Sequence, residues 1–138
     1  MNLVVDTNPI ISALIKDSTT RKIILYPKLD FFTPEYVFVE INNHKDVIMK
    51  KSGYDETELQ MIIDTVFSNI AVLPISEYQE FIPKAYGIMK EVDEFDTAFL
   101  ALALMIKGDG IWTNDPDFEK QKEVKVWKTE DMVRILEF

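Results

Sequence analysis

The amino-acid sequence alternates short apolar segments with longer segments whose apolar residues recur at helical intervals. Strands are predicted at residues 3–5, 29–33, 70–75, 111–113 and 124–127. Helices are predicted at residues 9–15, 19–26, 34–51, 55–69, 81–89, 94–107 and 129–136. Strands joined through helices run parallel, and right-handed crossovers place helices on both faces of the sheet. The sequence therefore predicts an α/β fold of three layers, α/β/α, around a mostly parallel sheet of four to five strands.

The size and composition of the chain fit one ordinary globular domain. The chain has 138 residues, of which 47% are hydrophobic, so we expect a single domain over residues 1–138. It contains 0 cysteines, which excludes disulfides and thiolate chemistry and favours a reducing, cytoplasmic setting. Neither a signal peptide nor an apolar run of the ~18 residues that span a bilayer is visible, so we expect no membrane-bound or secreted form.

Acidic residues outnumber basic ones by 24 to 15, which gives a net charge of −9. Bulk electrostatics will not draw such a chain to duplex DNA or to anionic lipid. The useful question is where the acids gather. In open parallel sheets, ligands bind outside the carboxyl ends of the strands. Acids that directly follow the strands are therefore the candidates for a functional site.

Five acids from four distant segments meet this criterion. Asp6 directly follows the first strand, and Asp115 falls two residues after Thr113, at the end of the fourth. Three more belong to helices that follow strands: Glu40 in the helix after the second strand, and Asp93 with Asp96 at the start of the helix that leads into the fourth. Because strand ends and the next helix starts share one edge of a parallel sheet, these carboxylates are expected to converge.

Converged carboxylates repel each other, so several ionised together need a cation. Oxygen ligands without His or Cys select Mg²⁺ or Mn²⁺ rather than zinc. Such ions activate water and stabilise charge during in-line attack on a phosphodiester. The sequence thus predicts an Mg²⁺ or Mn²⁺ site of acidic residues.

Taken in order, these segments resemble the PIN domain family, metal-dependent nucleases that include VapC-type ribonuclease toxins and rRNA-processing endonucleases. The resemblance spans nearly the whole chain, although each motif alone is weak. The matching segments are Val4-Val5-Asp6-Thr7-Asn8, Glu40, the run from Asp93 to Ala103, and Ile111-Trp112-Thr113-Asn114-Asp115-Pro116-Asp117-Phe118.

The resemblance implies a PIN-like fold, an Mg²⁺- or Mn²⁺-dependent endoribonuclease, and a role for each acid. Asp6, Glu40 and Asp96 would hold the first ion, with Asp115 and Asp93 assisting a second ion or orienting the attacking water. Two residues would support the site: Thr113 as the hydroxyl beside Asp115, and Asn8 as a polar neighbour. The extra acids Glu91, Glu94 and Asp117 depart from many toxin members, which have basic or small residues there.

Several of these residues also have purely structural interpretations. Asn8 before Pro9 is explained fully as a helix N-cap, and this leaves Asp6 without a helix to cap. Asp93 is equally explained as an N-cap, whereas Asp96 precedes a segment that is apolar on all sides. Asp117 is interpreted as solvated or, at best, as a group that supports the metal ligands from outside. His44 is interpreted as a partly buried, hydrogen-bonded side chain rather than a catalytic one.

The resemblance further implies an RNA substrate, a homodimer, and a possible antitoxin protein that would restrain a toxin; the sequence does not separate a toxin from a housekeeping nuclease. Two alternatives stay open. One is a catalytically inactive PIN-like module that binds RNA or protein. The other is an Mg²⁺-dependent phosphotransfer protein, which is disfavoured because Asn8 occupies the second position of the Asp-x-Asp motif found in haloacid dehalogenase-type phosphatases.

Overall fold

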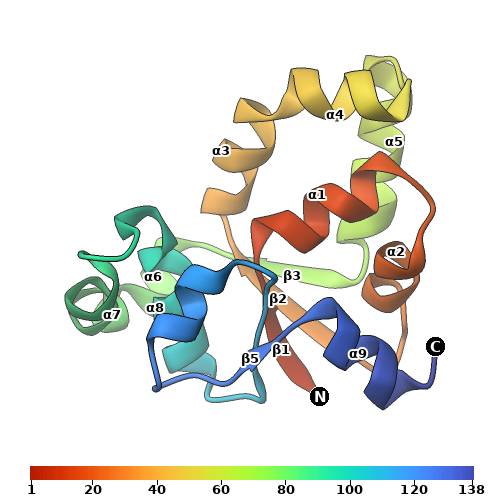
Figure 1. The fold of residues 1–138 in the computed structure, drawn as a ribbon. Coiled ribbons are helices and arrows are strands. Elements are labelled where there is room, and N and C mark those ends of the chain that lie inside the picture. Colours follow the sequence, from red (N-terminus) through yellow and green to blue (C-terminus); the bar gives the residue numbers. More distant parts are fainter.

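In a computed structural model that describes residues 1–138, five strands form one parallel sheet in the order β3-β2-β1-β4-β5 (Figure 1). The strands are β1 (Asn2–Val5), β2 (Asp30–Pro34), β3 (Ile70–Leu73), β4 (Gly110–Trp112) and β5 (Val126–Trp127). All five were predicted. Every connection between them passes through at least one helical segment, as parallel pairing requires.

Helices cover both faces of the sheet and complete the predicted three-layer α/β/α arrangement. One face carries α1 (Thr7–Ile15), α2 (Thr19–Ile24), α3 (Tyr36–Asn43), α4 (Lys45–Ser52) and α5 (Glu56–Phe67), with α9 (Thr129–Leu136) packed against α2. The other carries α6 (Ile75–Tyr78), α7 (Ile82–Met89) and α8 (Thr97–Ile106). Three short 3-10 turns complete the fold. The turn η1 (Gln79–Phe81) precedes α7, η2 (Glu94–Asp96) precedes α8, and η3 (Pro116–Lys120) follows β4. No helix is both long and apolar enough to span a membrane.

The strand order places a topological switch point beside β1. The chain moves from β1 outward to β2 and β3, then returns across the other face through α6, α7 and α8 to pair β4 with the free side of β1. The segments that follow β1 and β4 therefore turn toward opposite faces of the sheet. This divergence leaves a crevice at the carboxyl ends of the two strands. Asp6 and Thr113 each directly follow one of these two strands.

The core is built around the apolar helix α8 and the central strands. Phe99, Leu100 and Leu102 of α8 are completely buried, as are the side chains of β1 that face them. Trp112 of β4 packs on Phe31 of β2 with 5.6 Å between ring centroids. Full burial of each apolar side chain of this size adds roughly 1.5–3 kcal/mol to the free energy of unfolding. The carboxyl edge of the sheet is therefore supported by a stable core.

Two predicted elements are wrong in their extent. The predicted helix over residues 34–51 is two helices, α3 and α4, that meet at His44; the run Asn42-Asn43-His44 favours helices poorly, and His44 itself is exposed rather than partly buried. The third strand ends at Leu73 instead of continuing to residue 75. Pro74 has no N–H to extend the ladder, and the helix α6 begins directly after it.

Gly110, the first residue of β4, provides a test of the close packing between β4 and the segment that leads into β5. The φ angle of Gly110 is +130°, and a Cβ atom at this position would lie 2.2 Å from the carbonyl oxygen of Lys125, the residue directly before β5. We therefore expect Gly110→Ala to lower the free energy of unfolding by roughly 2–4 kcal/mol, because neither the backbone angle nor the space tolerates a side chain. Gly87→Ala in α7 is the matched control, since nothing lies within 4 Å of its added Cβ and alanine favours helix. Urea unfolding measures both, and equal midpoints would contradict this.

Candidate metal centre

Asp6 lies at the junction of β1 and α1, and both of its carboxylate oxygens are hydrogen-bonded. Oδ1 accepts from the backbone N–H of Thr7 at 2.8 Å, and Oδ2 accepts from the hydroxyl of Thr113 at 2.7 Å. The Asp6 N–H donates to the carbonyl of Trp112 at 3.0 Å, so its main chain continues the pairing of β1 with β4. The side chain is only 4% exposed. These contacts fix its orientation within the crevice.

The predicted cap of the first helix is wrong. Helix α1 begins at Thr7 with Asp6 as its N-cap, so Asn8 lies inside the first turn, where it is exposed and makes no side-chain hydrogen bond. Pro9 did not fix the start of the helix, because a proline is tolerated throughout the first turn, where N–H groups lack partners anyway. No hydrogen bond joins Asn8 to the acids, and its supporting role beside the site stays a prediction.

Glu40 is linked to Asp6 through Thr7, a residue that the sequence analysis did not single out. The Thr7 hydroxyl donates to Oε1 of Glu40 at 2.7 Å, and the Thr7 N–H binds Asp6. One residue thus couples the start of α1 to α3. The sequence gives little indication of this role of Thr7, because a threonine after an aspartate at the end of a strand is common at the start of a helix.

Asp96 is the most crowded of the acids. It is 7% exposed, and its Oδ2 is buried with no hydrogen-bond partner. Its pKa is raised to about 8, first by burial and then by the negative charges of the other four predicted acids: Asp6, Asp93, Asp115 and Glu40. All five predicted acids are therefore close enough to interact at one place.

Burial also raises the pKa of Asp6, to about 6, and the charges of Glu40 and Asp115 add to this. The hydrogen bonds from Thr113 and Thr7 act in the opposite direction, because they stabilise the ionised carboxylate. The pKa of Glu40 is raised by burial in spite of its bond from Thr7. None of the five acids forms an ion pair with a lysine or arginine. No lysine or arginine therefore compensates their mutual repulsion, and among basic side chains only His44 acts on them, by lowering the pKa of Glu40.

Asp117 joins the cluster, contrary to its interpretation as a solvated acid. One carboxylate oxygen from each of Asp93, Asp96 and Asp117 lies within 4.8 Å of the others, a spacing that a shared cation could bridge. Asp93 also accepts the Phe95 N–H at 3.0 Å, the N-cap role considered for it, so one oxygen orders the turn η2. Asp117 is paired with the exposed Lys120 at 3.3 Å.

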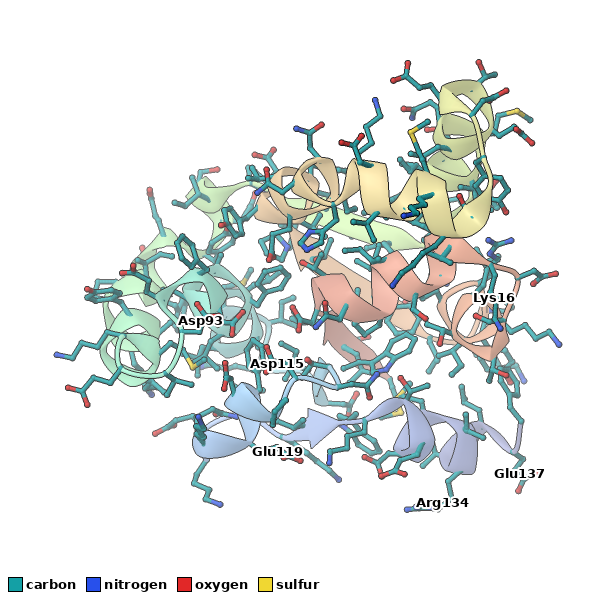
Figure 2. All side chains as sticks on the ribbon, turned by 45° about the horizontal axis from the view of Figure 1, so that its top comes forward. Lys16, Asp93, Asp115, Glu119, Arg134 and Glu137 are labelled. Atoms are coloured by element: carbon teal, nitrogen blue, oxygen red, sulfur yellow. The ribbon has the colours of Figure 1, made fainter.

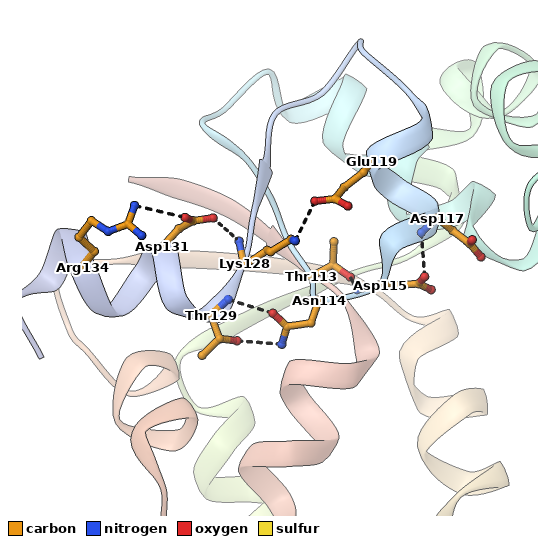
Figure 3. A network of polar contacts seen from close by, with 9 residues as sticks. All are labelled: Thr113, Asn114, Asp115, Asp117, Glu119, Lys128, Thr129, Asp131 and Arg134. Carbon is orange, nitrogen blue, oxygen red and sulfur yellow. Dashed lines mark hydrogen bonds and ion pairs between the residues drawn. The ribbon is translucent and has the colours of Figure 1, made fainter.

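The loop after β4 is held by the contacts drawn in Figure 3. The Thr113 hydroxyl accepts the N–H of Asp115 at 3.0 Å while it donates to Asp6, so it positions both acids. Asp115 Oδ1 accepts the N–H of Asp117 at 2.9 Å. Farther along the network, Asn114 exchanges two hydrogen bonds with Thr129 at the start of α9. Figure 2 shows Asp93 and Asp115 reaching the site from different parts of the chain.

The donor set fits a hard divalent cation. It consists of carboxylate oxygens from four segments, namely the β1–α1 junction, α3, η2 and η3 with their N-caps, and one buried oxygen of Asp96 lacks any partner. Oxygen-only sites of this kind suit Mg²⁺ or Mn²⁺, and a cation would remove the repulsion that raises the pKa values of Asp6 and Asp96.

Comparison with known proteins gives one match over nearly the full length. The family model described as the PIN domain matches residues 4–137. No curated protein matches this chain.

Proposed function

Because this chain belongs to the PIN domain family, and its resemblance to the nucleases of that family extends to the acids, we propose that it is a metal-dependent endoribonuclease that hydrolyses phosphodiester bonds. The observation that carries the proposal is the state of Asp96. It is a buried carboxyl with one unpartnered oxygen, and four further acids act on it without a basic partner. A fold that only bound RNA or protein would have little use for such an unfavourable arrangement.

The family resemblance assigns the first ion to Asp6, Glu40 and Asp96, which would hold it through their carboxylates. Thr113 and Thr7 keep Asp6 and Glu40 in place by hydrogen bonds. A bound Mg²⁺ or Mn²⁺ supplies a water of lowered pKa and stabilises negative charge on the phosphate.

Three further acids, Asp93, Asp115 and Asp117, lie on the turns η2 and η3 that border the cluster. They bind a second ion or orient the attacking water. Asp115 is placed for this by its N–H bond to Thr113 and by its own contact with the Asp117 N–H. The same acids keep the negatively charged backbone of RNA away until a cation is present, which makes substrate binding depend on the metal.

The resemblance also supports proposals about the setting of this activity. These are a cytoplasmic location, a homodimer, and a toxin that an antitoxin protein restrains by placing basic or hydrogen-bonding side chains in the acidic crevice. A short reading frame directly upstream would favour the toxin over a housekeeping nuclease.

The test is incubation of the purified protein with a mixed RNA pool, with and without Mn²⁺. We expect new fragments only with the metal, and we expect Asp6→Asn to abolish them, because Asp6 is a buried carboxylate oriented by two hydrogen bonds and close enough to interact with Glu40 and Asp115. A thermal scan of the same samples shows whether Mn²⁺ binds. Binding of Mn²⁺ without cleavage would indicate the inactive module. The absence of both binding and cleavage would contradict the metal site itself. Transfer of phosphate to the protein would indicate the phosphotransfer alternative.

A further inference from the structure

Beside the acids lies a shallow hollow of about 200 Å³ that the mechanism above does not use. It is lined by Tyr36, Ile82, Glu94, Phe95, Thr97 and Ala98. Phe95 and Thr97 flank Asp96 in the sequence, so the hollow and the candidate metal centre share one turn of the chain. Burial raises the pKa of Tyr36, at the start of α3, and the nearby charges of Glu40, Asp93 and Asp96 add to this.

Aromatic side chains make this hollow suited to a flat ligand. Phe95 is 63% exposed, although a side chain of this type is usually buried, and Tyr36 provides a second aromatic ring. The Glu94 carboxylate adds a hydrogen-bond acceptor to the lining.

We propose that this hollow is a subsite for one unstacked nucleobase of the RNA strand, next to the phosphate that is cleaved at the acidic site. The proposal rests on the nuclease function above. Aromatic rings at the rim can stack on a flat base, and single-stranded RNA offers bases that are free to turn out. The apolar side chains of Ile82 and Ala98 suit the faces of the ring, while the Glu94 carboxylate suits its edge.

The polar groups also favour one kind of base. The Glu94 carboxylate accepts hydrogen bonds and donates none at neutral pH, so it selects an edge with N–H donors. Guanine presents two neighbouring N–H donors on its Watson–Crick edge, whereas uracil presents one. We therefore expect guanine to occupy the hollow in preference to uracil.

Neutral nucleosides test the subsite without cleavage or metal, because they carry no phosphate for the acids to repel. We expect guanosine, added to isotope-labelled protein, to shift the NMR signals of Tyr36, Phe95, Thr97 and Ala98, and uridine to shift them less at equal concentration. Phe95→Ala should abolish these shifts. Phe138→Ala removes another exposed phenylalanine at the far C-terminal end of the molecule and should leave them unchanged (Figure 1).

Cleavage provides a second readout. With single-stranded RNA and Mn²⁺, Phe95→Ala should raise KM by roughly tenfold with kcat nearly unchanged, the size expected for one lost base stack. Glu94→Gln should reduce the difference between guanine- and uracil-containing substrates.

Three results would overturn the subsite: no nucleoside shifts, shifts confined to other surfaces, or a lower molecular mass of Phe95→Ala by light scattering, which would assign the ring to an interface between copies. If no RNA is cleaved but guanosine shifts these four residues, the nuclease proposal fails and the base site stands.

Discussion

Asp96→Asn is expected to abolish metal-dependent RNA cleavage and, at the same time, to make the metal-free protein more stable. Both effects arise from one side chain. Asp96 offers a buried oxygen that no protein group satisfies, and its ionised form is opposed by burial and by four neighbouring acids. Asparagine has the same shape and no charge. The substitution therefore relieves the repulsion while it removes the carboxylate that we propose as a ligand of the metal.

The expected sizes are large. Loss of a group that stabilises charge at the reacting phosphate costs at least about 10²-fold in rate. With a pKa of about 8, Asp96 must take up a proton on folding at neutral pH, and asparagine avoids this cost. We expect the gain to be on the order of 2–4 kcal/mol, which raises Tm by roughly 5–10 °C for a chain of this size. Mn²⁺ should raise the Tm of the original protein and have little effect on the variant.

Asp17→Asn is the matched control, because Asp17 is an exposed aspartate on the loop between α1 and α2. It removes the same charge, and we expect cleavage and Tm to stay as they are. If Asp96→Asn instead lowered Tm, the carboxyl of Asp96 would have to act as a structural hydrogen-bond acceptor. The proposal that this carboxyl destabilises the metal-free protein would then be wrong. Full activity in the variant would remove Asp96 from the site.

The architecture was predictable because each strand is a compact apolar run and segments with helical periodicity lie between most of them. The parallel order then brings strand ends to one edge, which selected Asp6, Asp93, Asp96 and Asp115 before any geometry was known, whereas the choice of Glu40 rested largely on the family resemblance. The charge interactions of Asp96 with the other four agree with that selection. Their roles in holding an ion stay a prediction.

Finer features were not predictable because they depend on local hydrogen bonds that several residues could make. Asp6 and Asn8 are both good N-caps, and only the structure shows that the carboxylate of Asp6 accepts the Thr7 N–H. Asp117 resembles any exposed turn residue in the sequence. It reaches Asp93 and Asp96 only because η3 folds back after Pro116, with Asp115 capping that turn.

Stability of the metal-free protein is expected to fall as pH rises from about 4 to about 8. The pKa values of Asp6 and Asp96 are about 6 and about 8 in the folded chain, above the usual 3.8 of an aspartate. Between these limits the folded protein holds protons that the unfolded chain has released, so the free energy of unfolding decreases with pH. Below the usual value both states are protonated, and above about 8 both are ionised, so the loss is confined to that window.

Divalent metal should remove this loss, because the ion binds the ionised carboxylates. We expect the fall in the free energy of unfolding to be on the order of 4 kcal/mol in EDTA. With saturating Mn²⁺ it should largely vanish, so the stabilisation by the ion grows with pH up to about 8. Urea unfolding across pH, with and without Mn²⁺, measures this, and the double variant Asp6→Asn/Asp96→Asn isolates the two acids from all others. Calorimetry in buffers of different ionisation enthalpy should show proton release when Mn²⁺ binds near pH 6.5. A slope that persists in the double variant would place its origin elsewhere, and binding without proton release would contradict the raised pKa values.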